Sequence, residues 1–215
     1  MFEAHGWATI RPTPENRDSG DQELSDIFLA DQAERTNHPA YDTPAYWQLR
    51  ERDAARRQRV SELLADGRVT APDDYFHAAL IFQHGETLED IWRAHLLAQK
   101  AAEMGATQTI DGKDSRWLAA ATLDRWLMYQ GKPQQYGTQF VPDGKRYRLW
   151  DVDPATTDAE RAANHVPALQ EQRKHAERLT EEDPPSGIDM DKAPQWLKEA
   201  IERWEQEDSE DPEDS

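Results

Sequence analysis

Two segments of the chain place polar groups where apolar helical faces end. In residues 24–35, the apolar face continues into Asp31 and Arg35, which stand four residues apart and can pair across one helical turn. In residues 72–85, an almost wholly apolar segment ends near His84. Histidine titrates near neutral pH and is the most common acid–base group of enzymes. We therefore predict that His84 is a catalytic acid or base, oriented by a carboxylate.

A further carboxylate falls on an apolar face later in the chain. Asp124 stands among apolar residues at helical spacing in the segment 115–131, and Arg125 follows it directly. Burying a carboxylate is costly unless it is paired and hydrogen-bonded. Asp124 should therefore face a cation or several hydrogen-bond donors, and the candidate cations are Arg35, Arg125 and His84.

The stretch QQYGTQF, residues 134–140, breaks the helical pattern just after this segment. Gly137 can adopt a positive φ and let the backbone approach a neighbour closely. The side chains around it, among them Tyr136 and Gln139, carry hydrogen-bond donors and acceptors but no charge. Groups of this kind either recognise a polar ligand or satisfy a buried ion pair beside Asp124.

Together these residues predict one polar pocket. We expect His84 and Asp124 to be catalytic, in the hydrolysis of a small polar molecule or in group transfer to or from it. An arginine would hold an anionic group of the substrate, and the side-chain amides would orient it. The residues expected to bind the substrate are Asp31, Arg35, Arg125, Tyr136 and Gln139.

Each of these groups also has a structural interpretation. His84 stands beside Gly85, where a histidine can cap the last carbonyl groups of a helix. The two acid–arginine pairs can be ion pairs of the fold, and the QQYGTQF stretch can simply tie its turn to the helices. No cofactor or metal ion is expected, because the chain has no cysteine and its histidines lack the spacing of metal ligands.

Helices must position these groups. The segment 43–67 has Thr43 as an N-cap, Pro44 at the first helical position and Gly67 beyond its end. Residues 140–152 predict a β-hairpin around a Pro-Asp-Gly turn. Further helices are predicted over 24–35, 72–85, 86–105, 115–131 and, with an interruption at Pro167, 158–179.

The predicted fold class is mainly α: a helical bundle-like domain with a small β-hairpin element and an acidic, disordered C-terminal tail. Residues 5–11 alternate weakly and predict a short strand. The expected parts are an N-terminal strand and loop at 1–22, a helical domain with the polar pocket at 23–180, a linker at 181–192, a docking helix at 193–206 and the tail at 207–215.

Composition and charge narrow the range of partners. The 215 residues carry a formal net charge of −18, and the 37% of hydrophobic residues includes eight tryptophans, which can supply a core. Such a charge argues against nucleic acids and anionic membranes, which bind clustered Lys and Arg. A small polar ligand or a basic protein partner remains. With no signal peptide and no membrane-spanning segment evident, we expect a cytoplasmic protein.

Four motifs in a fixed order carry a resemblance to a known family. DQAER at 31–35, FQHG at 82–85, LDR at 123–125 and GKPQQYGTQ at 131–139 resemble a family of uncharacterised bacterial proteins, the domain of unknown function 6624. The resemblance runs from residue 24 to about residue 180 and implies no activity. The chain departs from the family around 66–74, where GRVTAPDD replaces a Gly-Trp-Pro turn.

A shorter resemblance lies at the start of the chain. FEAHGWATIRPTPE, residues 2–15, is similar to the opening strand of an immunity-protein family of bacterial polymorphic toxin systems. This resemblance implies an immunity or antitoxin protein whose acidic surface binds a basic toxin. Opposite charges accelerate such an association.

Overall fold

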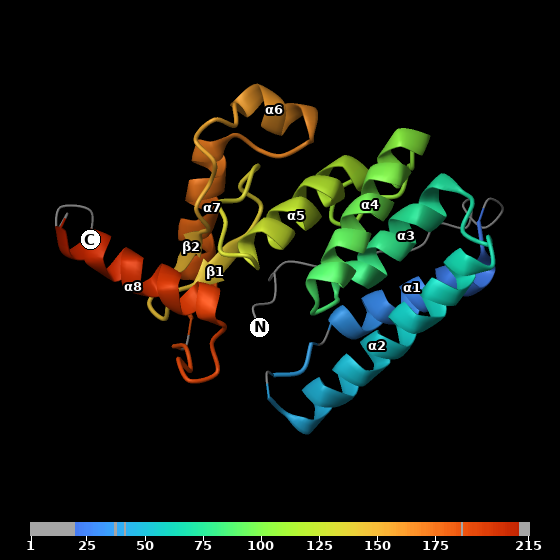
Figure 1. Cartoon of the computed structure of the whole chain (residues 1–215), viewed down its shortest axis with the longest axis horizontal. Helices are drawn as coiled ribbons and strands as arrows, with labels where there is room; N and C mark the ends of the chain where they lie inside the picture. The colour runs from blue at the N-terminus through green and yellow to red at the C-terminus, as the bar shows by residue number, and fades with distance from the viewer. Residues whose placement is uncertain (1–19, 37, 41, 186, 211–215) are drawn as a thin grey trace. The chain divides into compact units, whose positions relative to one another are not determined.

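The computed structural model describes residues 20–36, 38–40, 42–185 and 187–210. These residues contain eight α-helices and one two-stranded antiparallel sheet (Figure 1). The predicted fold class, mainly α with a small β-hairpin, is therefore confirmed. The predicted strand at 5–11 and residues 211–215 of the predicted tail lie outside the described residues.

Contacts within the chain define two compact units, and their boundary falls inside a helix, between Leu123 and Asp124. We call the described residues 20–123 the N-terminal unit and 124–210 the C-terminal unit. The helical domain predicted over 23–180 spans this boundary. Hydrophobic periodicity does not reveal a boundary of this kind, because the helical pattern continues through it.

The N-terminal unit is organised around α3 (Pro72–Gln83). This helix contacts three other helices of the unit, and Figure 1 shows α3 and α4 side by side. Every residue from Phe76 to Gln83 is buried, as expected for a central helix with apolar residues on all sides. The other helices are α1 (Gln22–Arg35), α2 (Pro44–Ala65), α4 (Leu88–Met104) and α5 (Ser115–Met128), which begins in this unit.

Local signals in the sequence set the ends of these helices. The Thr43 side chain accepts a hydrogen bond from the N–H of Tyr46 at the start of α2, and Pro44 is the first residue of that helix. Thr87 caps α4 in the same way. Helix α4 ends at Gly105, whose φ of 79° is left-handed and favours glycine.

The C-terminal unit is built around a β-hairpin. Strands β1 (Phe140–Pro142) and β2 (Tyr147–Leu149) pair antiparallel, with Phe140 opposite Leu149. The polar segment predicted as an interrupted helix forms two helices, α6 (Asp158–Ala163) and α7 (Leu169–Glu182), with Pro167 between them. Helix α7 lies against β2.

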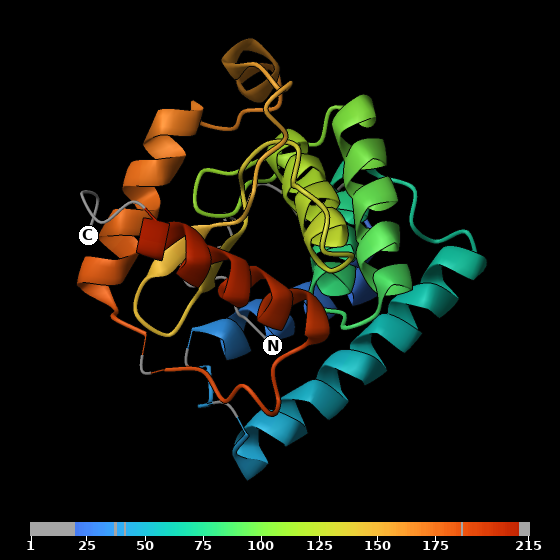
Figure 2. The same ribbon diagram turned by 60° about the vertical axis from the view of Figure 1, so that its left-hand side comes forward.

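Helix α8 (Gln195–Glu210) covers the hairpin of the C-terminal unit, as Figure 2 shows. It continues four residues beyond the predicted end at 206, so residues 207–210 of the predicted tail are helical. Trp150 of the hairpin packs edge-on against Trp196 and Trp204 of α8. The apolar face of α8 thereby joins a core that contains Met128, Val141, Trp150, Leu197, Ala200, Ile201 and Trp204.

Candidate functional site

The seven predicted site residues belong to two clusters, one in each unit. The hydrogen bonds and ion pairs described below each lie within one unit, and a single pocket formed by all seven residues stays a prediction. The clusters are Asp31, Arg35 and His84 in the N-terminal unit, and Asp124, Arg125, Tyr136 and Gln139 in the C-terminal unit.

His84 pairs with Asp31 in the N-terminal unit. Helix α3 ends at Gln83, which makes His84 its C-cap residue. The Nδ1 atom of His84 lies 3.2 Å from Oδ1 and 3.1 Å from Oδ2 of Asp31, a buried residue of α1. Burial raises the pKa of Asp31, but the His84 imidazole and two neighbouring arginines outweigh it and lower that pKa to about 2. The Asp31 carboxyl is therefore ionised at neutral pH.

The ionised carboxylate sets the tautomer of His84. Because Asp31 can only accept a hydrogen bond, Nδ1 of His84 carries the proton. Burial lowers the pKa of His84 below its ordinary value of 6.5, against the attraction of Asp31. The imidazole is then neutral at pH 7, with its lone pair on Nε2. No described residue hydrogen-bonds to Nε2, and the His84 side chain is 14% exposed. This nitrogen can therefore still accept a hydrogen bond or a proton.

Arg35 joins Asp31 to a second buried carboxylate, Asp53 of α2. Its Nη2 lies 3.1 Å from Oδ1 of Asp31 and 2.7 Å from Oδ1 of Asp53. The Nη1 of Arg56 lies 3.2 Å from the same Asp53 oxygen. Arg50 approaches the other oxygen of Asp53 with its Nη1 at 3.4 Å. The expected Asp31–Arg35 pair is therefore part of a buried network between α1 and α2.

Sequence reasoning missed Asp53, Arg50 and Arg56. These residues stand three apart on α2, so they share a face of the helix. The spacing of these three residues could have indicated a charge cluster on one face of α2. The cluster is hard to recognise in the sequence because α2 carries many other charged residues, and its polar face resembles one that contacts only solvent.

Two arginines of α2 bind the end of α3. The Nη1 atoms of Arg50 and Arg57 donate to the backbone carbonyl of His84 at 3.1 and 3.3 Å. Carbonyl groups at a helix C-terminus lack helical partners and favour cations. Gly85 follows, and a Cβ atom there would collide with the side chain of Asp90. Both the backbone and the ring of His84 are therefore fixed by polar contacts, the carbonyl by Arg50 and Arg57 and the ring by Asp31.

In the C-terminal unit, Asp124 is fully buried and receives four hydrogen bonds from the QQYGTQF loop. Its Oδ1 accepts from the N–H groups of Gln135 at 2.7 Å and Tyr136 at 2.9 Å. Its Oδ2 accepts from the N–H of Thr138 at 3.0 Å and from Thr138 Oγ1 at 2.8 Å. Burial raises the pKa of Asp124, and these bonds oppose the rise. The expected need for a cation or several donors is met by donors, which favours a structural role for Asp124.

The loop itself is held from two sides. The buried Gln134 side chain accepts from the N–H of Gln139 at 2.8 Å and donates to two backbone carbonyls. Gly137 has a φ of +90°, which side chains with a Cβ rarely adopt. Arg161 of α6, also buried, donates its Nε to the carbonyl of Tyr136 at 2.9 Å. The unusual composition of this stretch therefore serves its own folding.

Gln139 and Tyr136, two further predicted binding residues, make contacts of the same kind. The amide of Gln139 donates to Thr138 Oγ1 at 3.1 Å. Burial raises the pKa of Tyr136, and the Asn164 side chain hydrogen-bonds to its hydroxyl. Arg125 is buried in the last turn of α5. Of the two clusters, only the N-terminal one contains a histidine with an open nitrogen.

His77 is a buried histidine of α3 that belongs to neither cluster. Its ring stacks on Phe28 of α1, with the centroids 4.1 Å apart. The described residues provide no hydrogen-bond partner for its buried Nδ1. Burial lowers the pKa of His77 to about 4, against two nearby aspartates, Asp73 and Asp74. His77 is thus a packing residue.

His77 makes the stability of the protein depend on pH. The unfolded chain protonates this histidine below about pH 6.5, whereas the folded protein resists protonation until about pH 4. We expect the free energy of unfolding to fall by about 3 kcal/mol across this window as the pH is lowered. In His77→Leu this part of the slope should disappear in urea titrations at several pH values, whereas the exposed-site control His165→Asn should keep it. Equal slopes in wild type and His77→Leu would contradict the assignment.

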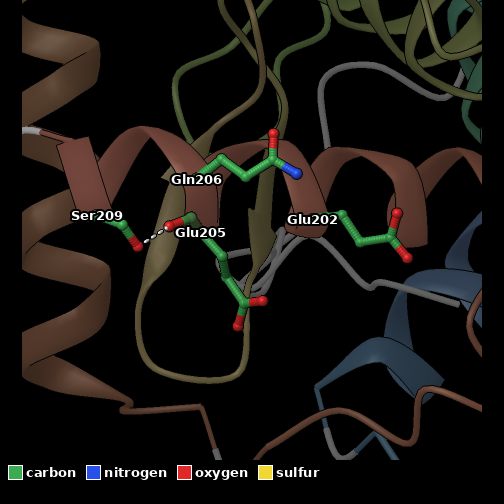
Figure 3. Close-up of a pocket in the computed structure, with 4 residues that line it drawn as sticks. All are labelled: Glu202, Glu205, Gln206 and Ser209. Carbon is green, nitrogen blue, oxygen red and sulfur yellow. Dashed lines mark hydrogen bonds between the residues drawn. The ribbon is translucent and has the colours of Figure 1, made fainter.

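One pocket among the described residues lies on α8. Figure 3 shows the residues that line it, Glu202, Glu205, Gln206 and Ser209, which all belong to this helix. The Ser209 hydroxyl donates to the backbone carbonyl of Glu205 at 2.6 Å. One helix face alone encloses no ligand. In the described part of the chain, no group of three or more His, Asp or Glu side chains is placed to hold a metal ion.

In comparisons with known proteins, the chain matches no protein-family model, no curated protein and no solved structure. Among the described residues, no helix is both long and apolar enough to cross a membrane. The resemblances carried by the ordered motifs and by the first residues stay predictions.

Proposed function

We propose that the N-terminal unit carries an acid–base site, in which His84 transfers a proton during hydrolysis or group transfer on a small polar molecule. The observation that carries this proposal is the His84–Asp31 pair. Asp31 holds Nδ1 of the imidazole, and Nε2 has no partner among the described residues. A carboxylate that orients a histidine in this way is a recurrent arrangement in enzymes.

The proposed proton transfer runs through Nε2 of His84. The neutral imidazole accepts a proton from water or from a hydroxyl group as its oxygen attacks the substrate. The imidazolium that forms is stabilised by the ionised Asp31 at 3.1 Å. It then returns the proton to the leaving group, which restores the neutral ring. The lowered pKa of His84 keeps the base form available at neutral pH.

The site predicts the behaviour of two variants. On a panel of p-nitrophenyl acetate, p-nitrophenyl phosphate and small amides, we expect His84→Ala to lower kcat on the accepted substrate by at least about 100-fold. Asp31→Asn should lower kcat more than it raises KM, because it disturbs the tautomer rather than binding. As the pH is raised, the rate of wild type should increase and reach its plateau before pH 6.5. The reason is that the base must be neutral and the pKa of His84 lies below its ordinary value of 6.5.

A control and an opposing outcome make this test decisive. His165→Asn changes an exposed histidine of the C-terminal unit and should leave the rate unchanged. The proposal fails if His84→Ala retains the wild-type rate, or if wild type converts no member of the panel faster than buffer.

A second candidate function rests on charge. The chain carries a net charge of −18, and α8 exposes Glu199, Glu202, Glu205 and Glu207. Such a surface suits an interaction protein of the immunity or antitoxin type, which binds a basic partner. Binding that weakens steeply with salt and is indifferent to His84→Ala would favour this function over the enzymatic one.

A further inference from the structure

Arg50 is fixed along one edge of its guanidinium group by buried partners. Its Nη1 lies 3.4 Å from Oδ2 of Asp53 and donates to the backbone carbonyl of His84 at 3.1 Å. The side chain is 11% exposed. Arg50 is therefore anchored to the turn that carries the proposed base, and its orientation is set from the inside of the unit.

The other edge of Arg50 faces a weakly held carboxylate. Its Nε and Nη2 lie 3.1 and 3.0 Å from the same oxygen, Oε1 of Glu86. Glu86 is 42% exposed, and its carboxylate has no other partner among the described residues. Two donors on one oxygen do not form the parallel two-bond arrangement that guanidinium and carboxylate groups prefer. An incoming oxyanion with two oxygens could use both donors and replace Glu86.

The charge of the inner network also favours an anion at this edge. Two carboxylates, those of Asp31 and Asp53, face the guanidinium groups of three arginines, which are Arg35, Arg50 and Arg56. All five side chains are at most 12% exposed. The surplus positive charge of the inner network is balanced by two more exposed carboxylates, Glu86 beside Arg50 and Glu34 beside Arg56. Of these two, Glu34 is shared with Arg52, so Glu86 is the one more easily displaced.

A further donor in the network has no acceptor. The Nε of Arg35 is buried, and the described residues provide no hydrogen-bond partner for it. A buried donor without an acceptor is destabilising and marks a group that an additional oxygen atom could satisfy. The network as a whole therefore has more donors than its own carboxylates use.

We propose that the outer edge of Arg50 is an oxyanion subsite, at which a carboxylate or phosphate group of the substrate replaces Glu86. This inference rests on the proposed function, because it places the anion beside the turn that presents His84. It narrows the substrate to a small molecule that carries an oxyanion close to the bond that is broken. Arginine suits this role because its planar fork matches both kinds of oxyanion.

Titration with inorganic phosphate and with acetate tests the subsite without any turnover. We expect Glu86→Gln to bind one or both anions about fivefold more tightly than wild type, because a competing rim carboxylate has been removed. Adding Arg50→Lys to Glu86→Gln should abolish the gain, since lysine keeps the charge but lacks the fork. Calorimetry at constant ionic strength measures each affinity. A response to phosphate alone or to acetate alone tells which oxyanion the substrate carries.

The matched control is Glu89→Gln, an exposed glutamate that changes the net charge by the same amount. The subsite is refuted if Glu89→Gln gains as much affinity as Glu86→Gln, or if neither anion binds Glu86→Gln more tightly than wild type. The same titration on His84→Ala should give an unchanged anion affinity, because the subsite does not use the imidazole. Anion binding by the protein while wild type turns over no member of the substrate panel would sink only the proposed reaction. Turnover that depends on His84, without the anion response, would sink only the subsite.

Discussion

Replacing Asp124 with alanine is expected to reduce the free energy of unfolding by about 3–5 kcal/mol. The carboxylate accepts three backbone N–H bonds and one hydroxyl bond from residues 135–138, and all of them are removed at once. Alanine leaves these donors without an acceptor in a buried position. Urea denaturation followed by tryptophan fluorescence measures the loss.

A matched control makes the result specific to Asp124. Glu181→Ala removes an exposed carboxylate of α7 in the same unit and should change the free energy of unfolding by less than about 0.5 kcal/mol. If Asp124→Ala is no more destabilising than this control, the four bonds do not hold the loop. The catalytic role predicted for Asp124 from the sequence would then regain support, since a polar group kept for function often contributes nothing to stability.

Replacing Asp53 with alanine is expected to cost about 3–5 kcal/mol as well, for a different reason. Asp53 neutralises three guanidinium groups within 3.4 Å. Without it, three like charges share a largely buried space with one remaining inner carboxylate, Asp31. The substitution should also lower the pKa of His84 further, because Asp53 helps to stabilise the imidazolium. Urea denaturation measures the first effect and an NMR titration of His84 the second.

Glu51→Ala is the control for Asp53. It removes an exposed carboxylate from the same helix and should leave both stability and the His84 titration unchanged. A loss below about 1 kcal/mol for Asp53→Ala would place the network among surface ion pairs, which contribute little. The firm placement of Arg50, on which the oxyanion subsite depends, would then lose its basis.

These two substitutions address the main structural question about the protein, namely what its buried polar groups are for. In the C-terminal unit, the loop supplies all four hydrogen bonds of Asp124, so this carboxylate is satisfied without a ligand. In the N-terminal unit, Nε2 of His84 and Nε of Arg35 have no partner among the described residues. Polar groups that the fold leaves unsatisfied are better candidates for function than those it satisfies.

The sequence by itself determined the local structure. Thr43, Pro44 and Thr87 start helices where the capping rules place them, because an N-cap depends only on residues a few positions away. The hairpin at residues 140–149 follows from its turn residues for the same reason. Periodicity placed Asp31 beside Arg35, and it showed that Asp124 would be buried and would need partners.

The tertiary structure decided which partners these groups obtained. Asp53 and Arg50 are buried only because α2 packs beside α1 and the end of α3, and their spacing alone is equally compatible with a solvated face. The partners of Asp124 are mostly backbone N–H groups, which every non-proline residue possesses and which therefore leave no mark in the sequence. Capping is a local interaction, whereas the pairing of buried charges depends on how distant segments meet.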